Sequence, residues 1–133
     1  MAETFTFELV SPERLLFSGE VVSVIAPGAA GEFEILKGHA PFLSTLRPGF
    51  VKAKLASGET RSLFVQGGFA DAGPVGLTIL AESAIPAESL KRETLEASIA
   101  SFQDALSHAH SDESRYRAET MIAQLREVEA QIS

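Results

Sequence analysis

The residues of this 133-residue chain that could do chemistry are three histidines and a pair of closely spaced glutamates. His39 with Glu32 or Glu34 could act as an acid–base pair, since imidazole and carboxylate groups both transfer protons in enzymes. Glu32 and Glu34 alternate with apolar residues, however, which is typical of the solvated face of a strand. His39 lies in a stretch crowded by Gly and Pro (38–41) and has no Ser or Asp arrangement typical of a catalytic triad. A structural or interface role is therefore favoured over catalysis.

His108 and His110 lie two residues apart and close to Asp112, so this segment could hold a metal ion. A metal site needs more ligands, held rigidly, and the surrounding residues are typical of a solvated loop. The chain has no Cys, which excludes disulfides, thiolate metal ligands and a cysteine nucleophile. It also has no glycine-rich phosphate loop and no serine at a nucleophile elbow. We predict no catalytic residue, no metal and no cofactor.

Composition restricts the partners that the chain can have. Eighteen Asp and Glu against eleven Lys and Arg give a net charge of -7, which disfavours nucleic acid because binding to phosphates requires an excess of basic side chains. No stretch approaches the roughly 18 consecutive apolar residues of a membrane-spanning helix, and the N-terminus does not resemble a signal or transit peptide. A cytoplasmic protein that binds other proteins is expected.

The distribution of Gly and Pro predicts two domains. All ten Gly lie between Gly19 and Gly76, and the last of the six Pro is Pro86. The residues that follow are rich in Ala, Glu, Leu, Gln and Arg, which favour helices. The sequence therefore predicts a β-domain over residues 1–86 and a helical domain over residues 87–133.

Alternation of apolar and polar residues predicts the strands of the first domain. Phe5, Phe7 and Leu9 alternate with polar residues, which indicates a half-buried strand. The same pattern predicts further strands over residues 20–26, 32–36, 50–56, 61–66 and 75–82. In the first of these, Val22, Val24 and Ala26 are expected to share a face. Turn residues at 57–59 join two of the strands into a hairpin. The fold expected is an antiparallel β-sandwich or flattened barrel.

Helical periodicity predicts an antiparallel two-helix hairpin for the second domain. Apolar residues recur at spacings of three and four on both sides of a polar loop at residues 107–111. The first stripe is Leu95, Ile99, Phe102 and Leu106, and the second is Ala118, Ile122, Leu125, Val128 and Ile132. Ser111 is the expected N-cap of the second helix, with acidic residues in the first turn behind it.

Several motifs, in order along the chain, resemble those of a known family. The longest is the run PGAAGEFEILKGHAPFL at residues 27–43, followed by LRPG at 46–49. VSPE at 10–13 and FSGE at 17–20 come before it, and VQGGF at 65–69 and TILA at 78–81 come after it. Together they resemble the bacterial epsilon subunit of F-type rotary ATP synthases. The length and the helical hairpin match this family in character.

The resemblance implies a non-catalytic rotor subunit of the central stalk, which couples proton flow to ATP synthesis. Its β-sandwich would bind the gamma subunit and the ring of c subunits, and its hairpin would contact the catalytic alpha and beta subunits. Glu32 matches a position near the c ring, whereas Ser11 and His39 match positions at the gamma interface. The protein would then be peripheral, on the cytoplasmic face of the bacterial inner membrane, with the membrane contacted only through the c ring.

Two departures from the family pattern carry further expectations. Members that bind ATP have an Ile/Leu-Asp-x-x-Arg motif where the first helix begins, but this chain reads LKRET at residues 90–94. We therefore expect weak ATP binding or none. Residues 87–133 also hold more acidic than basic side chains, whereas family hairpins that inhibit ATP hydrolysis use basic ones on an acidic segment. Inhibition by this hairpin is expected to be poor.

Two other functions are compatible with the residues alone. One is a free-standing β-sandwich module that binds a small ligand, and the other is a small enzyme that uses His39 with Glu32 or Glu34. Sugar recognition is disfavoured because the chain has no Trp and its single Tyr, Tyr116, belongs to the helical half. Formation of a stoichiometric complex with a gamma-type subunit would separate these functions from the role in the stalk.

Overall fold

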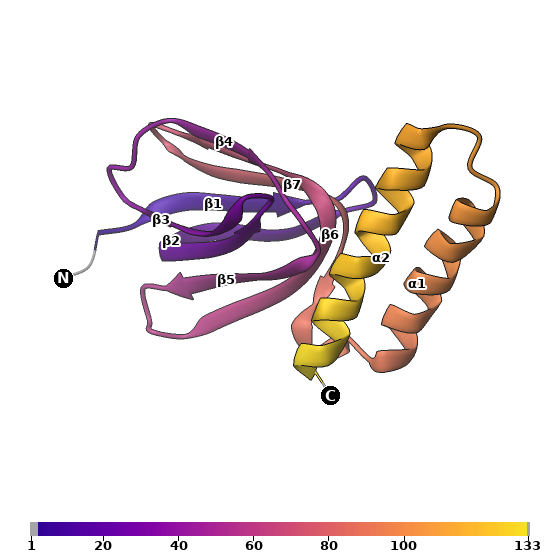
Figure 1. The fold of residues 1–133 in the computed structure, drawn as a ribbon. Helices are drawn as coiled ribbons and strands as arrows, with labels where there is room; N and C mark the ends of the chain where they lie inside the picture. Colours follow the sequence, from indigo (N-terminus) through magenta and orange to yellow (C-terminus); the bar gives the residue numbers. More distant parts are fainter. Residues whose placement is uncertain (1–2, 133) are drawn as a thin grey trace. The chain divides into compact units, whose positions relative to one another are not determined.

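The computed structural model describes residues 3–132, which form two compact units with their boundary between Glu88 and Ser89. The first unit consists of seven strands (Figure 1): β1 (Phe5–Val10), β2 (Leu15–Gly28), β3 (Gly31–Leu36), β4 (Phe42–Thr45), β5 (Gly49–Leu55), β6 (Thr60–Gly73) and β7 (Gly76–Pro86). The second unit contains α1 (Arg92–Ser107) and α2 (Asp112–Ile132), and a 3-10 turn, η1 (Ala87–Ser89), spans the boundary.

Five of the strands close into a ring. The hydrogen-bonded order is β1-β7-β6-β5-β2, and β1 also pairs with β2. β3 extends the sheet beside β2, and β4 pairs with β6. Closure satisfies the backbone hydrogen-bonding groups that an open sheet would leave at its edges. The predicted flattened barrel followed by two helices is confirmed.

Not every strand pair in this ring is antiparallel. β1 and β7 are parallel, with Val10 opposite Leu80, whereas the other four pairs in the ring are antiparallel. Strand directions cannot alternate around a closed ring with an odd number of members. A ring of five strands therefore requires at least one parallel pair, which alternation within single strands does not predict.

The two longest strands, β2 and β6, each pair with three other strands. β2 pairs with β1 through its first half and with β3 and β5 through its second half. The register of β2 against β5 shifts between Val21 and Ser23. Because of this irregularity Val21 is fully buried and Val22 only half-buried, so the expectation that Val22 shares the face of Val24 and Ala26 was wrong.

The barrel interior is filled by the inward residues of the alternating strands. Phe5, Phe7 and Leu9 of β1 are all buried, as their alternation predicts. They pack with apolar residues of the other strands, among which the fully buried ones are Val21, Val24, Ala26, Val51, Ala53, Val65, Ala70 and Ile79. Each large side chain in this set contributes about 1.5–3 kcal/mol through burial. The cluster runs from Phe5 to Ala84, so the first unit has a core of its own.

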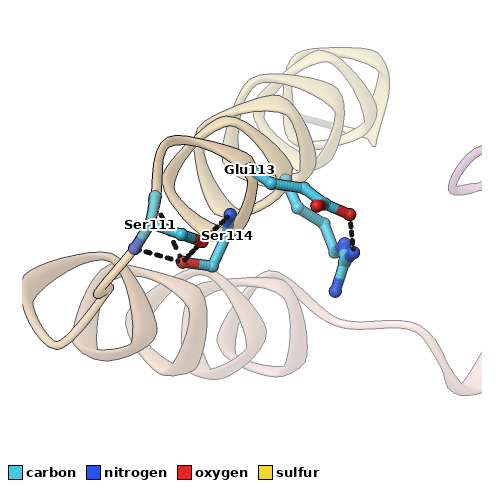
Figure 2. A network of polar contacts seen from close by, with 4 residues as sticks. Ser111, Glu113 and Ser114 are labelled. Carbon is cyan, nitrogen blue, oxygen red and sulfur yellow. Dashed lines mark hydrogen bonds and ion pairs between the residues drawn. The ribbon is translucent and has the colours of Figure 1, made fainter.

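The two helices pack against each other as a hairpin, with Leu95 of α1 and Leu125 of α2 fully buried. The Arg92 guanidinium lies 3.7 Å from the Glu129 carboxylate, which joins the start of α1 to the end of α2. The predicted N-cap is confirmed: the Ser114 backbone N–H donates to the Ser111 hydroxyl over 3.0 Å, and the Ser111 N–H donates back to the Ser114 hydroxyl over 3.3 Å (Figure 2).

Candidate functional site

An apolar strip crosses the outer face of four strands in the first unit. Strand register places Val10 opposite Leu80, Leu80 opposite Phe69, and Phe69 opposite Thr45. These four residues, which we call the Phe69 strip, come from β1, β7, β6 and β4. Phe69 and Leu80 are 42% and 40% exposed, although neighbouring Ala70 and Ile79 face the core. Exposed large apolar side chains in a contiguous row are typical of a binding surface.

Two depressions adjoin this strip. The first, the Phe69 groove, has a volume of about 500 Å³ and is lined by Val10, Ser11, Pro12, Thr45, Gly68, Phe69, Leu80, Ala81 and Glu82. The second, the Leu43 groove, has a volume of about 570 Å³ and is lined by Ala29, Ala30, Leu43, Ser44, Thr45 and Phe69. Thr45 and Phe69 belong to both linings, so the two grooves form one continuous surface. Leu43 is 69% exposed there.

Ser11 lies at one end of this surface, in the turn that follows β1. Its backbone N–H donates to the Arg14 carbonyl over 2.9 Å, and the Arg14 N–H donates to the Ser11 carbonyl over 3.3 Å. The Ser11 hydroxyl donates to the same Arg14 carbonyl over 3.4 Å. The turn therefore fixes Ser11, which is half-buried, in the lining of the Phe69 groove.

Glu32 lies beyond the other end of the surface. It is in β3, opposite Pro27 of β2, just after the hairpin tip that contributes Ala29 and Ala30 to the Leu43 groove. The tip is held to the next strand because the Ala29 N–H donates to the Thr45 carbonyl over 2.9 Å. Glu32 and Glu34 are both exposed on one face of β3, as their alternation predicts.

His39 lies apart from this surface. Its Nδ1 donates to the Leu36 carbonyl over 2.8 Å, and its ring packs edge-on against Phe5 with centroids 5.8 Å apart. Phe5 begins β1 and Val10 ends it, so His39 and Ser11 are at opposite ends of the strand. Nε2 is buried without a hydrogen-bond partner among the residues that the structure describes. Over residues 3–132, no hydrogen bond joins His39 to Glu32 or Glu34, as an acid–base pair would require.

The start of α1 has no acidic cap. Lys91 is the N-cap residue and makes no side-chain capping bond, and Arg92 is paired with Glu129. At the other end of α1, His108 Nδ1 donates to the Asp104 carbonyl over 2.9 Å and lies 3.6 Å from its carboxylate. His108 is thus bonded within its own helix end. Across residues 3–132, no group of three or more His, Asp or Glu side chains is arranged to hold a metal ion.

The apolar residues of the surface were not identified from sequence. Leu80 was expected within the strand at residues 75–82, whereas Phe69 and Leu43 lay outside the predicted strands and belong to β6 and β4 in the structure. The one available signal is that Ile79 and Leu80 are adjacent, as are Phe69 and Ala70, so both faces of β6 and β7 are apolar at this level. A strand in a flattened barrel buries one face against the core, and an apolar outer face therefore indicates a partner.

These features define a small closed β-barrel with a helical hairpin and an exposed apolar surface on the barrel's outer face. Residues 4–87 match the family model described as the beta-sandwich domain of the ATP synthase delta/epsilon chain. The chain belongs to this family. It is 46% identical over 132 residues to the ATP synthase epsilon chain of Mesorhizobium japonicum, with 99% of this chain and 98% of that one covered. It is 48% identical over 125 residues to the epsilon chain of Sinorhizobium medicae, with 94% and 92% covered.

Solved structures share the fold at low sequence identity. A chain of the Euglena gracilis mitochondrial ATP synthase, in a structure of its OSCP/F1/c-ring, matches with a TM-score of 0.75 at 20% identity over 98% of this chain and 82% of that one. A chain from the central stalk and c-ring of the Tetrahymena thermophila mitochondrial ATP synthase gives a TM-score of 0.63 at 13% identity, covering 96% and 98%. Neither described helix is long and apolar enough to span a membrane.

Proposed function

We propose that this chain is a non-catalytic rotor subunit of the central stalk of a bacterial ATP synthase. It would link the gamma subunit to the ring of c subunits and couple proton flow to ATP synthesis, peripheral to the cytoplasmic face of the inner membrane. The observation that carries the proposal is identity of about 45% to bacterial epsilon chains over nearly the full length of both chains. A shared fold with chains of two ATP synthase assemblies supports it.

Within this function, we assign the Phe69 groove and Ser11 at its end to the gamma subunit, and Glu32 to the c ring. The groove supports the first assignment because it exposes apolar side chains that burial against a partner would stabilise. Exposure of Glu32 beside a hairpin tip supports the second. His39 serves the gamma interface by fixing the loop between β3 and β4, through its bond to Leu36 and its contact with Phe5.

Complex formation tests the assignment to gamma. The purified chain is titrated onto ATP synthase that has been depleted of this subunit. It is expected to bind with one-to-one stoichiometry. Phe69→Asp is expected to weaken binding at least tenfold, because it buries a carboxylate in an apolar contact. Phe50→Ala in β5 is the control, since Phe50 packs on Phe64 and is absent from both groove linings. Equal binding by wild type and Phe69→Asp would contradict the assignment.

Charge reversal tests the assignment to the c ring. Glu32→Lys is expected to reduce ATP-driven proton pumping in reconstituted membranes while binding to gamma is retained. Glu34→Lys is the matched control because Glu34 shares the strand and the exposed face but is two residue pairs further from the hairpin tip. Pumping that is unimpaired by Glu32→Lys, or impaired equally by both variants, would show that Glu32 has no special contact.

We also propose that the chain binds ATP weakly or not at all. The α1 N-terminus carries Lys91 as an uncapped N-cap, and the Arg92 guanidinium is already paired with Glu129. Isothermal titration of the full chain with ATP is expected to give no saturable heat at micromolar concentrations. Saturable micromolar binding would overturn this proposal.

A further inference from the structure

The Phe69 strip is bordered by carboxylates on both sides. Same-face residues two apart along a strand are separated by about 7 Å. Glu8 is two residues before Val10 in β1, and Asp71 is two residues after Phe69 in β6, and register places both opposite Thr78 of β7. These two acidic residues therefore lie in one row, next to the apolar strip.

Glu82 borders the other side of the strip. It is two residues after Leu80 in β7 and is the one ionisable residue in the lining of the Phe69 groove. Its carboxylate lies over Gly67, where a Cβ atom would come within 2.9 Å of Oε2. Glycine at 67, with φ of 74°, thus leaves the space that the carboxylate occupies beside the groove.

We call these three carboxylates the acidic rim, and no basic side chain that the structure describes is paired with them. Across residues 3–132, Glu8, Asp71 and Glu82 take part in no ion pair, and Glu8 accepts one weak hydrogen bond from Ser18 at 3.5 Å. All three side chains are exposed, so water solvates them in the isolated chain. A partner that covers the strip removes part of this water, and positive charge opposite the carboxylates then offsets the lost hydration.

We infer that the partner segment that fills the Phe69 groove is apolar at its centre and flanked by Lys or Arg side chains. This inference rests on the proposed function, in which the partner is the gamma subunit. A second copy of this chain is disfavoured as the occupant because its net charge is -7 and it would bring the same carboxylates against each other. An anionic lipid surface is disfavoured for the same reason.

The experiment measures affinity for the subunit-depleted ATP synthase at salt concentrations from about 50 to about 300 mM. Wild-type binding is expected to weaken severalfold over this range because rim charges are screened. Glu82→Lys combined with Asp71→Lys is expected to weaken binding at least tenfold at low salt and to reverse the salt dependence, because salt screens the repulsion between these lysines and the basic side chains of the partner. Glu82→Gln, which keeps the shape, is expected to give a smaller loss. Glu3→Lys, which precedes β1 at the end opposite Val10, is the control and is expected to bind like wild type.

Other outcomes would distinguish failure of the inferred basic partner segment from failure of the proposed function. Wild-type binding with no salt dependence, together with unaltered binding by the double variant, would overturn the basic partner segment and leave the proposed function intact. No binding by the wild-type chain would overturn both. Phe69→Ala distinguishes the apolar centre from the rim, because it is expected to weaken binding at every salt concentration without changing the salt dependence. A dimer of the free chain that Phe69→Ala abolishes would assign the groove to a second copy instead.

Discussion

Gly68 directly precedes Phe69 in β6 and has a backbone conformation that other residues rarely adopt. Its φ is 113°, and a Cβ atom there would collide with the carbonyl oxygen of Leu80 on the neighbouring strand. Both the backbone angle and the close approach therefore require glycine. Because the Gly68 carbonyl accepts from the Leu46 N–H over 2.9 Å, the same residue also holds the segment that follows β4.

Replacement of this glycine tests how much stability depends on the absence of a side chain at this position. Gly68→Ala is expected to lower the free energy of unfolding by about 3 kcal/mol or more, measured by urea denaturation, because backbone strain and a backbone clash add. Gly58→Ala is the control, since Gly58 has φ of 93° but no atom within 4 Å of its Cβ position. It is expected to cost only about 1–2 kcal/mol. Equal losses for the two variants would show that the clash relaxes freely.

Glu20 of β2 is an exposed carboxylate whose pKa depends on hydrogen bonds from neighbouring threonines. The Thr6 hydroxyl donates to its carboxylate over 2.6 Å and the Thr4 hydroxyl over 3.0 Å. These two hydrogen bonds, with a smaller contribution from Lys37, lower the pKa of Glu20 below its ordinary value of 4.5. A carboxyl whose pKa is lower in the folded state stabilises the fold above its unfolded pKa, and this contribution is lost as pH falls through the folded pKa.

The Thr6 hydroxyl is accordingly expected to control acid sensitivity at this site. Thr6→Val is expected to move the pKa of Glu20 upward toward 4.5, as followed by NMR titration of its side-chain carboxyl. The loss of stability below about pH 4.5 should become shallower in the variant. Thr78→Val on β7 is the control, because Thr78 is not bonded to Glu20. An unchanged Glu20 pKa in Thr6→Val would mean that the hydrogen bond does not persist in solution.

At the scale of elements, the start of α2 depends on a short polar cap. Ser111 and Ser114 exchange hydrogen bonds between backbone N–H and hydroxyl groups (Figure 2). Between them, Glu113 pairs over 3.2 Å with the guanidinium of Arg117, which lies one turn further along the helix. The cap satisfies N–H groups that have no partner within the helix. Exposed pairs such as Arg117–Glu113 contribute little, so the cap is the stronger determinant of where α2 begins.

Removal of the cap is expected to loosen the first turn of α2. Ser111→Ala should lower helix stability by about 1 kcal/mol and speed amide hydrogen exchange at residues 112–115. Ser111→Asp is the conservative control and should retain protection, because aspartate also accepts from the N–H groups of the first turn. Exchange in Ser111→Ala that matches wild type would show that Ser114 or water replaces the cap fully.

At the scale of the whole molecule, each unit contains buried apolar residues of its own. The barrel cluster lies entirely between Phe5 and Ala84, and the helices bury Leu95 and Leu125. A chain that ends at Glu88 is therefore expected to fold, with dispersed amide resonances and cooperative thermal unfolding, and to bind the depleted ATP synthase with the affinity of the full chain. An unfolded fragment would contradict the independence of the barrel.

The same truncation tests whether the hairpin inhibits ATP hydrolysis in the assembled complex. Residues 87–133 hold nine acidic residues and only five basic ones, which are Lys91, Arg92, Arg115, Arg117 and Arg126. Two of the basic residues, Arg92 and Arg117, are already paired within the hairpin. Contact with an acidic segment is therefore disfavoured. Hydrolysis by the complex with the truncated chain is expected to stay close to the rate with the full chain, and a severalfold rise would show that the hairpin inhibits.

The sequence by itself determined the features that depend on local periodicity. Alternation in β1 predicts that Phe5, Phe7 and Leu9 face inward, and helical spacing predicts a hairpin that turns at residues 107–111. Cap chemistry identifies Ser111. These features involve residues a few positions apart, so the chain encodes them without knowledge of which strands are neighbours. The motifs over residues 4–86 also identified the family, which the relatives confirm.

Only the tertiary structure decided which residues meet across strands. Val10, Thr45, Phe69 and Leu80 are far apart in the chain, and pairing of β1, β4, β6 and β7 brings them into one strip. Ring closure with five strands made β1 and β7 parallel, and a register shift in β2 buried Val21 rather than Val22. Strand pairing and closure depend on contacts between residues that are far apart in the chain, and the packing of the whole barrel determines these contacts. Local alternation therefore fixes the face of a residue within a regular strand but not its neighbours on that face.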